Sequence, residues 1–378
     1  MICIFDKFTP QNKFDTCGER ILNPTSAYEI EERNGNYSYE ISVPMLESDD
    51  SWKFVKPYNI IKSSRGQLFP INKVEYGYVS GVPTVKAWAR HIWYYLSDKI
   101  VFESEINNYS CYWAIANILE NTYYGRGDKL VDYEFRHNSD ITDLKKISYD
   151  RISAANAILG SGDSIINLYG GELYRDNFYF SVNRRKEGAE NNAFSLIYDW
   201  NCTEIKHTID LSESLTEIDM TDNLGNWMRI SRVPDYQFPH QVMIAKRMSY
   251  DKETGSQIDI DTGKYWNDNC YAKVTYDVNL IDLKDTNREA GWGNLEKLTV
   301  GNTGYVHDII GEMHNDVQII STKYNDITGR MENVKLGNFR PSPLHYDRWD
   351  KVLSGDNAAY RRLDVLEGKS NFFTLVED

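Results

Sequence analysis

Histidines are the first residues of this 378-residue sequence that could do chemistry, because their ring nitrogens bind metals and carry protons. None of the seven forms a His-Glu-x-x-His pattern or stands at zinc-finger distance from a cysteine. His307 and His314 are seven residues apart, with only Glu312 nearby. We therefore expect isolated histidines and no metal site.

Cysteine nucleophiles are the second chemistry to consider. The best conceivable pairs join Cys111 or Cys202 to His91 or His207, but neither cysteine lies in a nucleophile motif, and a buried thiol is the ordinary state of such residues. The sequence also contains no Gly-x-Ser-x-Gly elbow, no P-loop and no dinucleotide fingerprint. We expect no catalytic residue and no cofactor.

The stretch from Asp259 to Gly263 resembles the start of a calcium loop, because its carboxylates alternate and a glycine follows. An EF-hand-like loop starting at Asp259 would need its closing glutamate at the position of Cys270. The segment is therefore predicted to be a solvated turn. The 56 acidic residues also offer many carboxylate pairs for glycoside hydrolysis, and only their separation in space would distinguish one.

Aromatic side chains cluster at Trp88, Trp93, Tyr94 and Tyr95. Exposed aromatic rings can stack on sugars, so a glycan-binding site is one interpretation. In a strand-rich protein such residues more often fill cores and subunit interfaces, and we favour that interpretation.

Composition restricts the class of protein. A formal net charge of −14 argues against a surface that binds nucleic acid by neutralising phosphates. No stretch is long and apolar enough to span a bilayer, and the first residues do not resemble a secretion signal. Five scattered cysteines indicate reduced, mostly buried thiols rather than a disulfide scaffold. The 27 tyrosines, 9 tryptophans and 14 phenylalanines favour strands and interfaces.

Alternating apolar residues predict a mainly β fold with a few short helices, a β-rich α+β class. The first predicted strand covers residues 33–43 after an Asn34-Gly35 turn. Two hairpins are expected, one joining 74–78 to 85–89 and another joining 178–182 to 194–198 through a long polar loop. Later strands are expected at Val274–Leu280, Leu298–Val300, around Val306, and as a pair of Val317–Ile319 with Val334–Leu336 across an Asn325–Gly329 turn. Helical spacing predicts helices at 109–119 and 152–159.

Length and these elements predict several domains. We expect a first β-barrel domain over 1–105, a small helix-containing domain over 106–165 and a second β-barrel with inserted strands over 166–340. The Arg340-Pro341-Ser342-Pro343 segment disfavours helix and strand and marks the start of a C-terminal extension, 341–378, with a helix starting near Ser354.

Five segments follow one another along the chain: Glu31–Tyr37 (EERNGNY), Ile60–Lys62 with Gln67–Ile71, Val85–Ile92, Gly170–Phe178 (GGELYRDNF) and Leu298–Asn338. Together they resemble one family, the N-terminal hub region of siphophage tail-associated lysins and prophage tail endopeptidases, also called phage minor structural proteins. The similarity covers most of residues 30–338. One departure is Tyr198-Asp199-Trp200-Asn201-Cys202, which stands where the family has a Y-G-K-N-L turn.

The resemblance implies a protein similar to the baseplate hub of contractile phages, with two tail-tube-like β-barrels and smaller inserted domains. It implies a homotrimer that closes the distal end of the tail tube at the virion tail tip and lets DNA pass on host attachment. Expected partners are a hexameric distal tail protein, the tape measure protein and receptor-binding baseplate proteins. Longer family members carry a C-terminal peptidoglycan hydrolase, and this chain stops about forty residues after Asn338, too short for such a domain.

Two rival functions stay open at this point. A cell-wall hydrolase would need a cleft with convergent catalytic groups. A glycan-binding module would need exposed aromatic rings whose removal abolishes binding.

Overall fold

The computed structural model describes residues 1–123, 133–160, 164–198, 201–210, 217–222, 227–231, 245–250, 273–280, 297–308 and 313–338. Strands dominate these residues, and the helices are few and short, as predicted. None of the described helices is long and apolar enough to cross a membrane.

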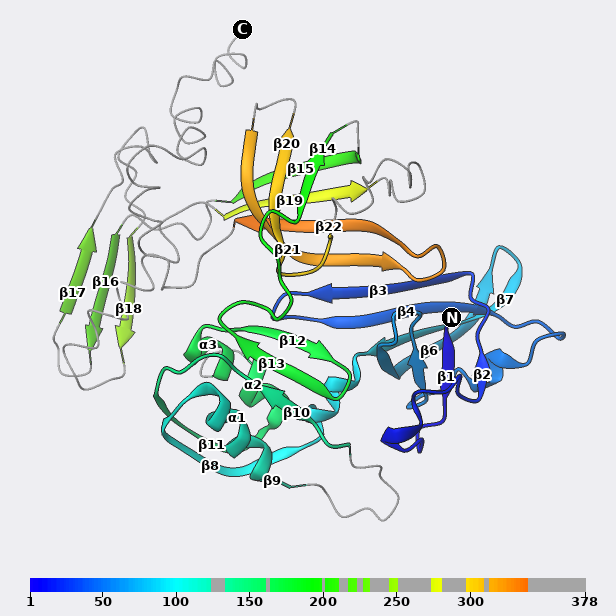
Figure 1. The fold of residues 1–378 in the computed structure, drawn as a ribbon, viewed down its shortest axis with the longest axis horizontal. Coiled ribbons are helices and arrows are strands. Elements are labelled where there is room, and N and C mark those ends of the chain that lie inside the picture. Colours follow the sequence, from blue (N-terminus) through cyan, green and yellow to red (C-terminus); the bar gives the residue numbers. More distant parts are fainter. Residues whose placement is uncertain are drawn as a thin grey trace, which may run out of the picture.

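A 13-stranded sheet is the largest element of the fold (Figure 1). Its N-terminal half is formed by β1 (Cys3–Phe5), β2 (Arg20–Ile21), β3 (Ser26–Glu32), β4 (Tyr37–Pro44), β5 (Ile60–Lys62), β6 (Leu68–Val79) and β7 (Val82–Arg90). Its C-terminal half is formed by β14 (Phe194–Ile197), β15 (Cys202–Asp210), β19 (Lys273–Leu280), β20 (Thr303–Asp308), β21 (Met313–Asn325) and β22 (Arg330–Asn338). The halves join where β21 pairs antiparallel with β3, Ser321 facing Glu32 and Asn325 facing Tyr28.

Local sequence explains the hairpins of this sheet. Ser80 and Gly81 have φ values of 50° and 82° and join β6 to β7, the two-residue turn whose twist matches antiparallel strands. The predicted turn over Asn325–Gly329 joins β21 to β22, with Gly329 at φ 72°. Both hairpins were predicted and are confirmed.

A smaller lobe contains the helices. It includes α1 (Cys111–Glu120), α2 (Ala154–Leu159) and α3 (Ile165–Tyr169), a sheet of β8 (Ile100–Tyr109), β9 (Thr122–Tyr123) and β11 (Lys145–Ser153), and a sheet of β10 (Arg136–Asn138), β12 (Glu172–Asp176) and β13 (Tyr179–Asn183). The two predicted helices are confirmed as α1 and α2. Short 3₁₀ helices lie at η1 (Gln11–Lys13), η2 (Ser51–Phe54) and η3 (Ile92–Ser97).

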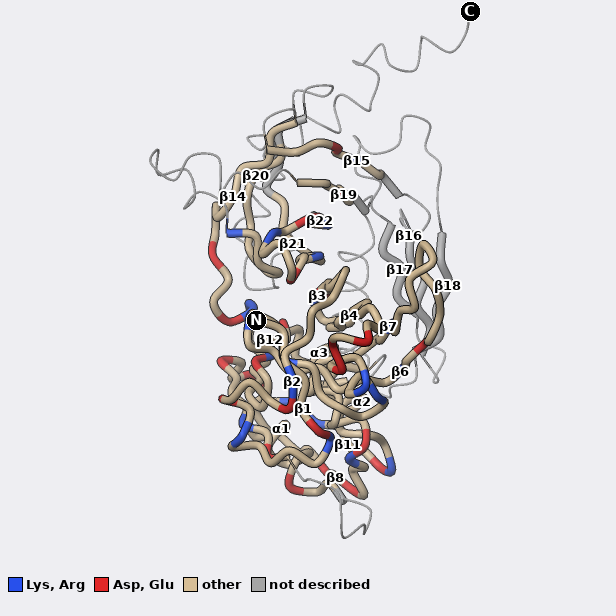
Figure 2. Tube along the Cα trace, turned by 90° about the vertical axis from the view of Figure 1, so that its right-hand side faces the viewer, with Lys and Arg blue, Asp and Glu red and all other residues tan. Residues whose placement is uncertain are grey.

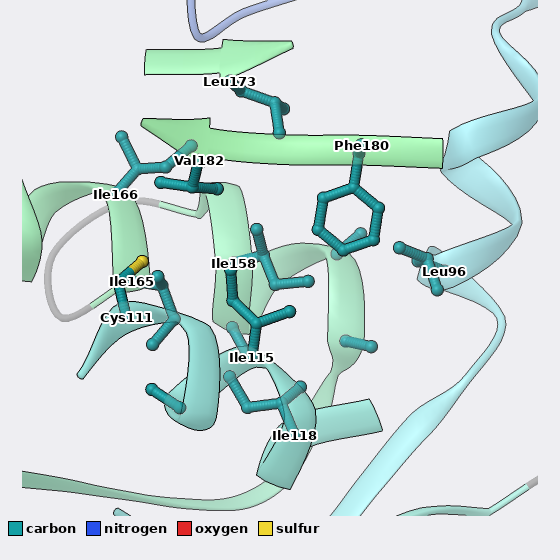
Figure 3. Close-up of a cluster of buried hydrophobic side chains, with 14 of the residues drawn as sticks. Leu96, Cys111, Ile115, Ile118, Ile158, Ile165, Ile166, Leu173, Phe180 and Val182 are labelled. Atoms are coloured by element: carbon teal, nitrogen blue, oxygen red, sulfur yellow. The ribbon is translucent and has the colours of Figure 1, made fainter. Parts of the chain in front are cut away.

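One apolar core fills this lobe. Helix side chains such as Ile115, Ile118 and Ile158 pack against Phe180 and Val182 of β13 (Figure 3). Trp93 belongs to the same core, so the lobe starts within η3 and continues through β13. Other cores lie under β3, β4 and β7, and between β14, β19, β21 and β22. The predicted domain boundaries and barrels therefore stay predictions, with the helical core reaching past residue 165.

A separate three-stranded sheet contains β16 (Glu217–Asp222), β17 (Trp227–Ser231) and β18 (Ala245–Tyr250). In it β16 pairs antiparallel with β17 and parallel with β18.

The expected hairpin between 178–182 and 194–198 is wrong. β13 instead pairs with β12 across the Asn177 turn and with β10, whereas β14 pairs parallel with β20 in the large sheet. Apolar residues recur at alternate positions in both segments, as expected for strands, but this alternation does not indicate which strands pair with each other. The expected strand at Leu298–Val300 is also wrong, because residues 297–300 form a connection into β20. The expected turn at Asp259–Gly263, Cys270 and the C-terminal extension lie outside the described residues.

Candidate functional site: a buried polar junction

Strand β3 carries charged residues on its buried face. Ala27, Glu29 and Glu31 alternate with more exposed neighbours and are all buried. Burying a carboxylate is costly unless it is paired and hydrogen-bonded. The partners of these two glutamates come from distant parts of the chain.

Glu31 forms an ion pair with Lys186, which lies in the segment after β13 of the helical lobe. Its Oε1 lies 2.6 Å from Lys186 Nζ, and both side chains are almost fully buried. The backbone amide of Lys186 donates to Glu172 Oε2 at 3.0 Å. This contact connects β3, β12 and the segment after β13.

Glu172 is also the centre of a second set of contacts. Arg33 Nη2 lies 2.8 Å from Glu172 Oε1, and Arg33 Nη1 donates to Gln318 Oε1 at 2.6 Å. Gln318 Nε2 in turn donates to Glu172 Oε1 at 3.1 Å and to the carbonyl of Gly301 at 3.1 Å. The C-terminal half of the sheet is thereby joined to both β12 and the β3–β4 turn.

Arg175 of β12 is 3 % exposed and binds mainly backbone carbonyls. Its Nη1 donates to Gly35 O at 2.9 Å and to Tyr94 Oη at 3.0 Å, and its Nη2 donates to Glu32 O at 3.2 Å. The guanidinium also lies 5.1 Å from the centre of the Tyr37 ring, within cation–π range. A planar group with several donors suits this clamping of a turn.

The Asn34 side chain hydrogen-bonds to backbone groups at the start of β12, as the backbone of a neighbouring strand would. Its Nδ2 donates to Gly171 O at 2.9 Å and its Oδ1 accepts from Leu173 N at 2.8 Å. The residue has φ 47°, a conformation that asparagine tolerates better than most residues. The predicted Asn34-Gly35 turn is therefore also a docking element.

The β12–β13 turn docks on the segment before β6. Asn177 Oδ1 accepts from Leu68 N at 2.8 Å, and Asn177 Nδ2 donates to Gly66 O at 3.1 Å. Gln67 Nε2 donates to Asp176 Oδ1 at 3.0 Å. These contacts hold the helical lobe against the N-terminal half of the sheet.

His91 belongs to the same group of contacts, and its imidazole ring is neutral there. Its Nε2 is 2.9 Å from Gln67 Oε1, and its Nδ1 accepts from Trp93 N at 3.3 Å. The ring stacks on Tyr37 at 4.5 Å. Complete burial, and then the positive charge of Arg175, hold the pKa of His91 well below its usual value of 6.5.

Glu29 forms the other end of the arrangement. Its Oε1 accepts from Tyr37 Oη at 2.8 Å and lies 3.2 Å from Arg65 Nη1. Burial raises the pKa of Glu29, an effect that Arg65 opposes, and burial beside Glu29 raises the pKa of Tyr37 well above its usual value. Beside it, Tyr39 Oη donates to Asp326 Oδ2 at 2.5 Å.

We call this whole set the polar junction. It lies where the two halves of the large sheet and the helical lobe meet, and its charges are used on one another and on backbone groups. Such an arrangement fixes the relative position of three parts of a chain rather than presenting groups to a substrate. Its members are Glu29, Glu31, Arg33, Asn34, Gln67, His91, Glu172, Arg175, Asn177, Lys186 and Gln318.

The structure does not bring together the thiol and imidazole pairs considered from the sequence. Burial raises the pKa of Cys111 to about 12, which makes it a poor nucleophile. Cys202 donates to Asn201 Oδ1 at 3.4 Å, while His207 stacks on Tyr276 at 4.6 Å. His91 is committed to the junction. The expectation of no catalytic residue stays a prediction.

Metal ligands do not gather in the described part of the chain, where no group of three His, Cys, Asp or Glu residues could hold an ion. His307 and His314 occupy facing positions across the β20–β21 pair, which spacing alone did not indicate. Of the aromatic cluster, Trp93 is fully buried, and Tyr94 Oη donates to Gly35 O at 2.8 Å. These two rings are part of the core and junction, the role favoured from the sequence.

A contrasting surface lies at the end of the β6–β7 hairpin, at one end of the molecule (Figure 1). Tyr76 and Tyr78 are 61 % and 79 % exposed, and Val79 and Val82 next to the turn are also exposed. We call these four residues the hairpin tip. Lys73 pairs with Glu75 at 2.5 Å on the opposite strand face, so the two tyrosines occupy an uncharged face.

Comparison with known proteins identifies the fold. No protein-family model and no curated protein matches the sequence. Among solved structures, the prophage tail protein gp18 from Listeria monocytogenes is similar, with a TM-score of 0.60, 17 % identity, and coverage of 94 % of this chain and 99 % of that one. The tail protein from Neisseria meningitidis has a TM-score of 0.60 at 9 % identity over 89 % of this chain and 96 % of its own.

The 43 kDa tail protein of prophage MuSo2 from Shewanella oneidensis is a third such structure, with a TM-score of 0.59, 12 % identity, and coverage of 90 % and 98 % of the two chains. The chain therefore has the fold of these three tail proteins. At these identities the likeness concerns the fold alone.

All five segments that resembled the tail-hub family contribute to the polar junction. Glu31 and Arg33 come from the first, Gln67 from the second, His91 from the third, and Arg175 from the fourth. Gln318 comes from the fifth. The sequence of each segment forms a local pattern, and the spacing of these residues does not indicate that they meet. The one available signal was charged residues on the apolar side of an alternating strand.

Proposed function

We propose that this protein is the structural hub of a phage tail tip, a homotrimer that closes the distal end of the tail tube and allows DNA to pass on host attachment. The fold, shared over nearly the full length of three tail proteins, two of them from prophages, carries the proposal. The virion tail is the corresponding location. Two tail-tube-like barrels, one from each half of the large sheet, are part of the same proposal.

The hairpin tip is the contact we propose for trimer formation. Exposed tyrosines on an uncharged strand face, with exposed valines flanking the turn, suit a protein interface, where aromatic residues are enriched and charged residues depleted at the centre. A second copy of the chain is the occupant that a closed ring requires. Each copy would place its tip against its neighbour.

The charge of the chain suits DNA passage. A net charge of −14 disfavours adhesion of DNA to the inner surface of a ring. Figure 2 shows acidic and basic residues intermixed over the described residues, so an acidic lining would depend on which surfaces face the channel. Proposed partners are a hexameric distal tail protein, the tape measure protein and receptor-binding baseplate proteins.

Mass measurement by light scattering tests the assembly directly. The purified chain is expected to have three times its monomer mass when alone, or to add three times its monomer mass to the ring of distal tail protein after mixing. A monomer in both conditions would overturn the trimer. Matched samples with Tyr76→Ser and Tyr78→Ser together are expected to stay monomeric.

Two further measurements test the absence of other functions. Zymography on cell walls is expected to show no clearing, and clearing by the purified chain would replace the hub by a hydrolase. Duplex DNA at low salt is expected not to bind, and tight binding would contradict passage of DNA through an unadhesive channel.

A further inference from the structure

Two free cysteines lie together at the first strand. Segment 14–20 folds back over β1, where Glu19 N donates to Ile4 O at 2.8 Å and Arg20 pairs with Ile4. Gly18, at φ 65°, lies so close to the Ile4 carbonyl that a Cβ there would be only 2.4 Å from its oxygen. This approach carries the neighbouring Cys17 onto β1.

Cys17 lies close enough to Cys3 to raise the pKa of the Cys3 thiol. Cys17 Sγ also lies 3.9 Å from Met1 Sδ, which places it beside the strand face that Cys3 shares with Met1. The two thiols differ in access, because Cys3 is buried and Cys17 is exposed. Burial and then the neighbouring Cys17 raise the pKa of Cys3, while Lys62 opposes the rise.

We propose that Cys3 and Cys17 form a reversible disulfide when the protein meets a small-molecule disulfide such as oxidised glutathione. The exposed Cys17 thiolate attacks one sulfur of oxidised glutathione and releases one glutathione thiolate. The Cys3 thiolate then attacks Cys17 Sγ and releases the second. Two protein thiols are oxidised, one glutathione disulfide is reduced, and the two protons lost by the cysteines end on the two glutathione molecules.

The bond would fix a loop that covers an aromatic core. Phe14 lies between the two cysteines in sequence and packs on Phe5 at 5.1 Å and on Phe178 of the helical lobe at 5.8 Å. Lys62 Nζ donates to Phe14 O at 2.6 Å. Closing the segment between the cysteines restricts the unfolded chain and keeps this loop on both lobes. The inference is independent of the proposed tail function.

Thiol mapping tests the disulfide. The intact chain is incubated with oxidised glutathione, unreacted thiols are blocked with a maleimide, and peptides are identified by mass spectrometry. We expect the number of free thiols to fall from five to three, a linked Cys3–Cys17 peptide, and a higher thermal midpoint that a reductant reverses.

Variants separate the two steps. Cys3→Ser is expected to retain glutathione on Cys17, because the resolving thiol is gone, and Cys17→Ser is expected to acquire none at Cys3. Cys202→Ser, which alters a buried cysteine elsewhere, is expected to form the bond normally. Five free thiols after oxidation of the wild type, or glutathione persisting on Cys17 in it, would overturn the proposal.

Discussion

The polar junction and the hairpin tip invert the usual distribution of side chains in opposite ways. The junction buries charges such as Glu31 and Lys186, whereas the tip exposes Tyr76 and Tyr78. Buried charges cost free energy unless they find geometrically matched partners, so they define one arrangement of the chain. Exposed apolar side chains leave no contact within the chain when they bind another protein, so they suit association.

The difference divides the work between the two regions. In the junction, each partner comes from the same chain, and the contacts determine how the sheet halves and the helical lobe are held. At the tip, the partner we propose comes from another chain. Substitutions should therefore separate stability from assembly, as the following predictions state in order of their effect on folding.

Removing Lys186 is expected to have the largest effect. Lys186→Met leaves Glu31 buried without its ion pair, and the free energy of unfolding should fall by about 3–5 kcal/mol. Urea denaturation followed by circular dichroism measures the loss. The double variant Glu31→Gln with Lys186→Met should recover much of it, because no uncompensated charge stays buried.

An exposed ion pair is the matched control. Lys297 Nζ lies 2.6 Å from Glu190 Oε1, the same separation, but both side chains are about half exposed. Lys297→Met should change the free energy of unfolding by less than about 1 kcal/mol. Equal losses at the two lysines would contradict the special role of burial.

Asn34→Ala is expected to be next. It leaves Gly171 O and Leu173 N without their partner, and the free energy of unfolding should fall by about 2–3 kcal/mol. Asn192→Ala is the control, because Asn192 has a similar φ of 53° in an exposed loop. Chemical denaturation of both variants separates the effect of the docking contacts from that of the backbone conformation. A similar loss of unfolding free energy in both variants would contradict a docking role for Asn34.

His91 predicts a pH dependence. Its pKa in the folded state is depressed below that of the unfolded chain, so the unfolded chain binds the proton first and acid destabilises the fold. Between about pH 7.5 and about pH 5.5 this group should cost roughly 1.4 kcal/mol. The difference between wild type and His91→Gln, measured by urea denaturation at both pH values, cancels other titrations. A constant difference would show that His91 binds its proton equally well in the folded and the unfolded chain, which would contradict the lowered pKa.

The hairpin tip should matter least for folding. Tyr76→Ser with Tyr78→Ser removes exposed rings, so the free energy of unfolding of the monomer should change by about 0.5 kcal/mol or less. Light scattering should nevertheless show loss of the trimer. Trp113→Ser removes another exposed ring, on α1, and should leave assembly intact.

Particular elements show how far sequence reasoning reached. The β6–β7 and β21–β22 hairpins and helices α1 and α2 were predicted because alternation, turn residues and helical spacing are local properties. The predicted pairing of 178–182 with 194–198 failed because β14 finds a parallel partner over a hundred residues away, in β20. Local patterns contain no information on such partners.

The sequence by itself determined a mainly β, acidic, aromatic chain and the order of five segments resembling a tail-hub family. Only the tertiary structure decided that those segments meet, because the pairing of β21 with β3 and the side-chain contacts of β12 bring Glu31, Glu172 and Gln318 together over long separations. It also decided that Trp93 is core while Tyr78 is surface. Residue type states what a side chain can do, but burial and partners, which depend on the whole chain, decide what it does.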